Sequence, residues 1–122
     1  MALPNVRPLN EWVVTAKSAS IGSTPIAAFC VAPVKGRVVR TFVVTEGTLT
    51  GTLAVSVGIN GGSDIGAGGL SVAAGAAGST ASDTPANAAG NAIVNEGDTI
   101  AFTPSGATGS SIPGCFHAVI RE

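Results

Sequence analysis

The sequence predicts a single all-β domain, a two-sheet sandwich of jelly-roll type with an extended N-terminal arm. Apolar residues tend to alternate with polar ones instead of recurring every three or four positions. Glycine, proline, serine and threonine also interrupt the chain often, which leaves little room for helices. A chain of 122 residues is long enough for one domain with one hydrophobic core.

The strand pattern is clearest in residues 48–59, where leucine, valine and isoleucine face one side and small, mildly polar residues the other. The β-branched run at 37–45 predicts a second strand, and Glu46-Gly47 predicts a turn that joins the two as a hairpin. Further strands are expected at 11–16, 26–31, 70–72, 92–94, 99–103 and 115–121. A total of about seven or eight evenly spaced strands is typical of a sandwich or jelly roll.

Turn and loop signals separate these strands. Asn60-Gly61 is a pair suited to positive φ angles and predicts a tight turn. Residues 73–91 are rich in alanine, glycine and serine and have too little apolar bulk for an ordinary core element. They are expected to form a long loop, which is a place where a binding surface could lie.

The first ten residues, MALPNVRPLN, contain two prolines and no strand pattern. We therefore divide the chain into an arm, residues 1–10, and a sandwich domain, residues 11–122. Leu3, Val6 and Leu9 give the arm apolar anchors, and Arg7 adds a charge. We expect the arm to lie on a neighbouring molecule, where it would add contact area; a disordered terminus is the alternative.

The charge composition indicates a surface that a protein partner covers. Only 11% of the residues are charged, against about 25% in typical soluble domains, and the formal net charge is −1. A weakly charged surface of this kind favours association, so we expect part of it to be covered. Six basic residues are balanced by seven acidic ones, which argues against nucleic acid as a partner.

No apolar run approaches the roughly 20 residues that span a bilayer, and the first residues lack a secretory pattern. We therefore expect no membrane partner and a cytoplasmic location until the protein assembles. Cys30 and Cys115 are far apart and form no CxxC motif, so reduced thiols are favoured over a long-range disulfide.

Catalytic and metal-binding signals are weak. His117 has no serine or cysteine motif beside it that would mark a nucleophile, so we interpret it as structural. Cys115 and His117 share a strand face but make only half a metal site. Asp64, Asp83 and Asp98 are explained more simply as turn formers than as calcium ligands. The sequence thus predicts no enzyme activity, no cofactor and no metal.

Lys35, Arg37 and Arg40 form a basic cluster. The ordinary interpretation is a solvated turn and strand edge. The alternative is pairing with acidic groups on a partner protein, because the planar guanidinium of arginine suits carboxylates. Together with Leu3, Val6, Arg7 and Leu9 of the arm, these residues are the candidate partner contacts.

Three stretches, GTLTGTLAVSVGINGGSDI, LSVAAGAAGS and TPANAAGNAIVNEGDTIAFTPSGAT, precede a short final strand. Their order of strand, Ala/Gly tract, Gly-Asp turn and strand resembles that of the decoration, or cement, proteins of tailed-bacteriophage capsids. The resemblance covers roughly two-thirds of the chain. It implies a non-enzymatic β-sandwich on the exterior of the virion that ties neighbouring major capsid subunits together. It also implies a homo-oligomer, a trimer or dimer.

Two other function classes compete with this reading. A receptor- or glycan-binding module of a phage fibre would use the loops of a β-sandwich, but the predicted loops contain neither tryptophan nor tyrosine. A hydrolase would need a nucleophile, a base and an orienting group, and the chain has one histidine. The capsid role is therefore the leading hypothesis.

Overall fold

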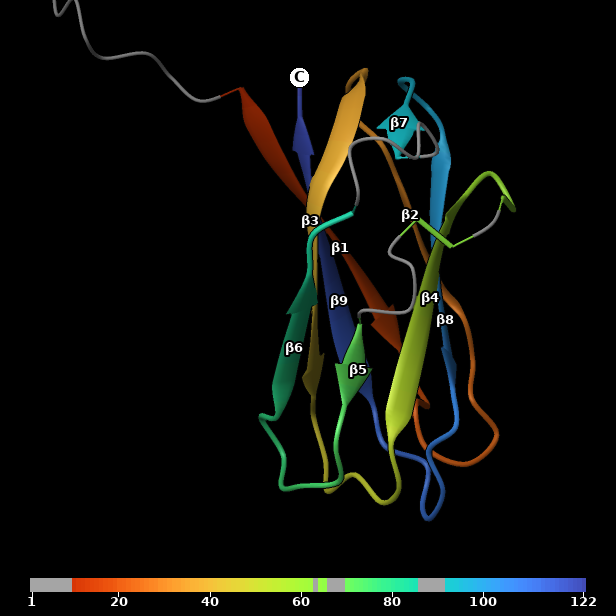
Figure 1. Ribbon diagram of the computed structural model, residues 1–122. Helices are drawn as coiled ribbons and strands as arrows, with labels where there is room; N and C mark the ends of the chain where they lie inside the picture. The colour runs from red at the N-terminus through yellow and green to blue at the C-terminus, as the bar shows by residue number, and fades with distance from the viewer. Residues whose placement is uncertain (1–9, 63, 66–69, 86–91) are drawn as a thin grey trace, which may run out of the picture.

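A computed structural model describes residues 10–62, 64–65, 70–85 and 92–122. All the regular secondary structure in these residues is β (Figure 1). The strands are β1 (Glu11–Ser18), β2 (Ala28–Val31), β3 (Gly36–Thr45), β4 (Leu53–Ile59), β5 (Ser71–Val72), β6 (Thr80–Asp83), β7 (Ile93–Val94), β8 (Thr99–Ser105) and β9 (Gly114–Arg121). The described residues contain no helix that is long and apolar enough to cross a membrane.

The strands form two antiparallel sheets that pack face to face (Figure 1). One sheet has the order β1-β9-β3-β6, with β7 also paired to β3, and the other has the order β2-β8-β4-β5. The chain crosses from one sheet to the other at most of its connections, and the first strand pairs with the last. This order confirms the predicted β-sandwich of jelly-roll type.

The core lies between the sheets and is built by alternation. In β8, Ile100 and Phe102 are fully buried, whereas their neighbours face outward. Phe102 stacks on Phe116 of β9 in the opposite sheet, with ring centroids 5.0 Å apart and planes 12° apart. Because this pair spans the gap between the sheets, it is the central contact that holds them together.

The predicted hairpin of residues 37–45 and 48–59 is wrong. Strands β3 and β4 lie in different sheets, so the chain between them crosses the sandwich. Regular pairing of β4 starts only at Leu53, because Gly51 has a positive φ of 76° that interrupts the extended backbone. Before it, Leu49 and Thr50 make only isolated bridges. The alternation of buried and exposed residues in β4 is confirmed, but its pairing with β3 is not.

The loop predicted at 73–91 contains a strand. Strand β6 pairs through its backbone with Thr41–Val44 of β3. A strand at the edge of a sheet can be held by backbone hydrogen bonds on one side and needs little apolar bulk, which explains why composition concealed it. Residues 86–91 of the predicted loop lie outside the described residues.

The predicted turn at Asn60-Gly61 is confirmed. Both residues have positive φ angles, 53° and 79°, and the N–H of Gly62 donates to the carbonyl of Ile59 at 2.9 Å. The turn folds over the end of β4, where a Cβ added to Gly58 would lie 2.6 Å from the carbonyl oxygen of Gly62. Only glycine at position 58 lets the turn approach so closely.

A β-bulge in β3 decides which side chains face outward. Val38 pairs with Ile120 and Arg40 with Val119, so Val39 is an extra residue on the β3 side. Val38 and Thr41 are both buried, although they are three positions apart. Without the extra residue, strict alternation from Val38 would turn Arg40 toward the core; the bulge places it on the outer face instead.

Candidate functional site

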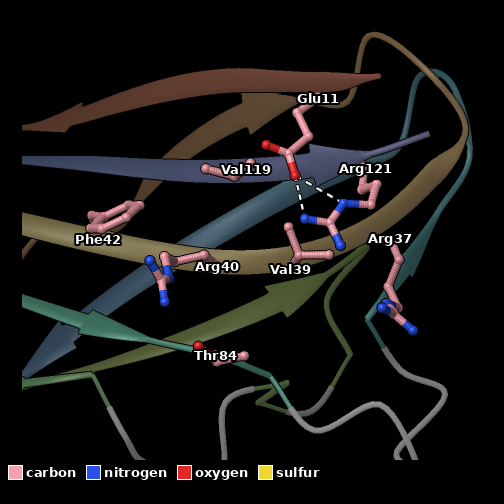
Figure 2. A pocket seen from close by; sticks show the side chains of 8 residues that line it. All are labelled: Glu11, Arg37, Val39, Arg40, Phe42, Thr84, Val119 and Arg121. Atoms are coloured by element: carbon pink, nitrogen blue, oxygen red, sulfur yellow. Dashed lines mark hydrogen bonds and ion pairs between the residues drawn. The ribbon is translucent and has the colours of Figure 1, made fainter. Parts of the chain in front are cut away.

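A cavity of about 500 Å³ opens on the outer face of the five-stranded sheet, where the ends of β1, β9 and β3 meet (Figure 2). Three arginines converge on it from two strands and share it with one carboxylate and one aromatic ring. The residues that line it are Glu11, Arg37, Val39, Arg40, Phe42, Thr84, Val119 and Arg121. We call this cavity the arginine pocket.

Sheet pairing explains the hollow. On the side of β3 away from β9, β7 pairs with Gly36 and Arg37, whereas β6 pairs only from Thr41 onward. The bulge residue Val39 therefore lies in a notch between the two short strands. Arg37 and Arg40 extend on either side of Val39, and Thr84 closes the pocket at the end of β6 (Figure 2).

The arginines of the pocket differ in their partners. Nε of Arg121 donates to Oε2 of Glu11 at 2.8 Å, and the same guanidinium donates a second hydrogen bond to that oxygen from Nη2. The guanidinium of Arg40 lies 5.8 Å from the ring centroid of Phe42, which is a cation–π contact. Among the described residues, neither Arg37 nor Arg40 has an ion pair. The pocket thus keeps two uncompensated positive charges.

The structure brings together part of the predicted contact set. Arg37 and Arg40 both line the pocket, but Lys35 is exposed in the connection before β3 and is not among the lining residues. The arm residues Leu3, Val6, Arg7 and Leu9 lie outside the described residues. Sequence reasoning missed Glu11 and Arg121, since only the pairing of β1 with β9 brings them to the pocket.

The outer face of the four-stranded sheet has a different character. None of the residues that point outward from its strands carries a charge. They are Phe29, Val31, Ala54, Ser56, Ser71, Thr99, Ala101, Thr103 and Ser105. We call this surface the uncharged face.

Two large apolar side chains stand at one border of the uncharged face. Phe29 is 63% exposed and Val31 58% exposed, both on the edge strand β2. The rest of the face consists of side chains no larger than threonine, which lose little conformational entropy when they are covered. An apolar border beside a flat, small-residue surface is typical of a protein-protein contact.

A cysteine and a histidine lie side by side on β9. Sγ of Cys115 is 3.7 Å from Nε2 of His117, and Nδ1 of His117 is hydrogen-bonded to the Thr15 hydroxyl at 3.0 Å. No sequence motif marks this arrangement, although the strand pattern predicts that the cysteine and the histidine share one face. None of the three side chains lines the arginine pocket, although all three lie on the paired strands β1 and β9.

The predicted absence of metal ligands stays a prediction. Among the residues that the structure describes, no three histidine, cysteine, aspartate or glutamate side chains come together in a group that could hold a metal ion. Asp98 acts as the turn former that its sequence context predicts: Oδ2 accepts from the N–H of Asn95 at 2.8 Å. A hydrogen bond from the Asn60 side chain, followed by this one from the Asn95 backbone, lowers the pKa of Asp98.

Both thiols are free. They lie in different sheets, Cys30 on β2 and Cys115 on β9. Cys30 packs against the core, and burial raises its pKa from 9.0 to about 11. The folded state therefore binds this proton more tightly than the unfolded chain does. Its contribution to stability is complete below the unfolded pKa near 9 and is lost as the pH rises through about 11.

This linkage predicts that alkali destabilises the protein through Cys30. Between about pH 8 and pH 10.5, we expect the melting temperature of the wild type to fall more steeply than that of Cys30→Ala. Circular dichroism at several pH values measures both profiles, and the absence of tyrosine removes one other group that titrates in this range. Two parallel profiles would contradict the prediction.

Comparison with solved structures shows which proteins have a similar fold. A chain in the acid-stable capsid of Helicobacter pylori bacteriophage KHP30 matches with a TM-score of 0.55, 13% identity, and 96% of this chain and 90% of that chain covered. A chain of the cyanophage Pam1 capsid matches with a TM-score of 0.56, 18% identity and coverages of 98% and 89%. The fold is one found in phage capsids.

A third similar structure is a glycoside hydrolase family 43 arabinoxylan arabinofuranohydrolase from Bacillus subtilis, with a TM-score of 0.50 and 9% identity. The match covers 96% of this chain but only 28% of the enzyme. No protein-family model matches the chain, and no characterised protein matches it in sequence. At these identities the similarities establish the fold, and function has to be argued from the surfaces.

Proposed function

We propose that the protein is a structural virion protein that binds the outer surface of a phage capsid and cements neighbouring major capsid subunits. The uncharged face carries this proposal. It is a flat, uncharged β-surface bordered by the exposed Phe29 and Val31, and its burial against a protein would cost no charge desolvation. The fold shared with the two phage capsid chains supports the same role.

Repetition strengthens such a contact. A capsid presents many copies of the same site, so modest contacts per molecule add up when the protein associates with itself. We therefore include a homo-oligomer, a dimer or trimer, in the proposal, with a cytoplasmic stage in the host before the protein reaches the virion exterior. We also propose residues 1–10 as an arm that adds contact area to a neighbour.

The alternative, a receptor- or glycan-binding module of a phage fibre, has less support. Glycan sites use aromatic platforms, and among the described residues Phe29 is the one aromatic side chain that points outward from the uncharged face. The similar hydrolase matches over 28% of its own length and at 9% identity, so the likeness is one of fold alone. The surface thus favours a protein partner.

A charge on the uncharged face should abolish capsid binding. We expect Phe29→Lys to weaken binding to purified shells of the phage that encodes the chain by at least about tenfold, because the new ammonium would be buried in an apolar contact. Co-sedimentation of the protein with shells at increasing concentration measures the affinity.

The matched control is Val13→Lys. Val13 is 64% exposed, against 63% for Phe29, but lies on β1 in the other sheet. This variant is expected to bind shells no more weakly than the wild type, because the new ammonium would lie outside the uncharged face, beside Val119 of the arginine pocket. Failure of the wild type to sediment with shells would overturn the proposed function. Equal binding by Phe29→Lys and Val13→Lys would show that the uncharged face is not the contact surface.

A further inference from the structure

The arginine pocket is a second surface that the proposed contact does not use. It opens on the five-stranded sheet, whereas the uncharged face belongs to the four-stranded sheet on the opposite side of the sandwich. A molecule that joins two neighbours needs two such surfaces. The pocket is therefore a candidate for the second contact, and its side chains indicate what it could bind.

We propose that the arginine pocket binds the carboxylates of an acidic segment of the partner protein. This inference rests on the proposed function and names the chemistry of one of its contacts. Arg37 and Arg40 are the two guanidiniums without an ion pair among the described residues. A guanidinium presents two parallel N–H donors that match both oxygens of a carboxylate.

The pocket already contains one guanidinium–carboxylate pair, in which both N–H donors reach the same carboxylate oxygen. Glu11 receives two hydrogen bonds from the guanidinium of Arg121, which shows that a carboxylate fits beside these strands (Figure 2). The contact with the ring of Phe42 orients Arg40. This side chain therefore loses less conformational entropy when a ligand binds. The site is thus partly preorganised for a second carboxylate.

The walls favour a protein segment over a phosphate polymer. Val39, Val119 and Phe42 are apolar and suit the methylene groups that carry a glutamate or aspartate carboxylate. A nucleic acid would need cations along its track. Outside the pocket, Lys35 adds one exposed charge, whereas Lys17 is paired with Glu46 near the other end of β1. Inside the pocket, the carboxylate of Glu11 would repel a dense polyanion.

The chain's own arm is a poor occupant. Residues 1–9 read MALPNVRPL and include no acidic residue. A second copy would offer exposed acids such as Glu96 and Glu122, but no run of them, because no two acidic residues are adjacent in the sequence. We therefore commit to an acidic segment of a different protein, and a second copy becomes an outcome of the test.

The test titrates the full-length protein with capped pentaglutamate, capped pentaglutamine and inorganic phosphate by isothermal calorimetry. We expect binding of pentaglutamate alone, and at least about tenfold weaker binding by the Arg37→Gln/Arg40→Gln double variant, since two charge-assisted contacts are lost. Lys35→Gln is the matched control: it removes one nearby positive charge outside the pocket and should bind as the wild type does. Arg40→Lys should bind more weakly than the wild type, because the planar fork is lost while the charge stays.

Three calorimetric results would overturn the inference: no binding of pentaglutamate, equal binding of pentaglutamine or phosphate, or the same loss of pentaglutamate affinity in Lys35→Gln. A fourth is a molar mass, measured by light scattering, that is lower for the double variant, since this would show that the pocket holds a second copy of the chain. The shell assay with the double variant separates this inference from the proposed function. If the double variant binds shells as the wild type does, the pocket does not contact the capsid, and the proposed function is unaffected. If the wild type binds pentaglutamate but not shells, the pocket binds carboxylates and the proposed capsid function is wrong.

Discussion

Replacement of Phe102 by alanine is expected to lower the free energy of unfolding by about 3–5 kcal/mol, a large part of the total stability of a typical domain. The Phe102 ring is fully buried and stacks on Phe116 across the two sheets at 5.0 Å. Its removal leaves a cavity at the centre of the sandwich that two hydrogen-bonded sheets cannot readily close. Urea denaturation of both proteins measures the difference.

Phe29→Ala is the matched control for this substitution. It deletes the same side chain from a position that is 63% exposed, so the expected cost is within about 0.5 kcal/mol. A similar loss for Phe29 and Phe102 would mean that the two sheets do not pack as described. A small loss for Phe102 alone would mean that the core can collapse into the space left by the ring.

The second large effect is expected from Ala118→Asp, which should prevent folding. Ala118 is fully buried on β9, the strand between β1 and β3. A carboxylate there would face apolar neighbours with no cation, and an unpaired buried charge costs several kcal/mol. The fraction of soluble protein and the presence of a cooperative melting transition measure the outcome.

The adjacent substitution, Val119→Asp, tests the same strand from its other face. Val119 points outward and lines the arginine pocket, so the new carboxylate would lie among guanidiniums instead of in the core. We expect this variant to fold with a melting temperature equal to or above that of the wild type. Unfolding of both variants alike would contradict the assigned direction of β9.

The fold class can be predicted from the sequence, whereas the pairing of the strands cannot. Alternation identified the buried positions of β4, because the period of two is a local property of a strand. Pairing is not local: β3 was assigned to β4, its neighbour in sequence, but hydrogen-bonds to β9 and β6. A jelly roll separates consecutive strands, so the short-turn signal at Glu46-Gly47 marks a crossing between sheets.

The candidate site was predictable in the same partial way. Arg37 and Arg40 stood out as a basic cluster, but strict alternation would have placed them on opposite faces of the strand. The bulge at Val39 puts both on one face, and no residue type in the sequence marks it. The ion pair of Glu11 and Arg121 could not be predicted for a different reason. The two residues are 110 positions apart, and no local pattern connects them.

The position of β9 has a consequence for the synthesis of the chain. This strand lies between β1 and β3, so neither of them can complete its pairing before β9 has left the ribosome. Thr15 and His117, which face each other in this pairing, are 102 positions apart. The nascent chain therefore exposes the open edges of β1 and β3 until residues 114–121 have emerged, which is the period when unpaired strands aggregate. The larger sheet forms only after that point, and pairing over such distances makes the step slow.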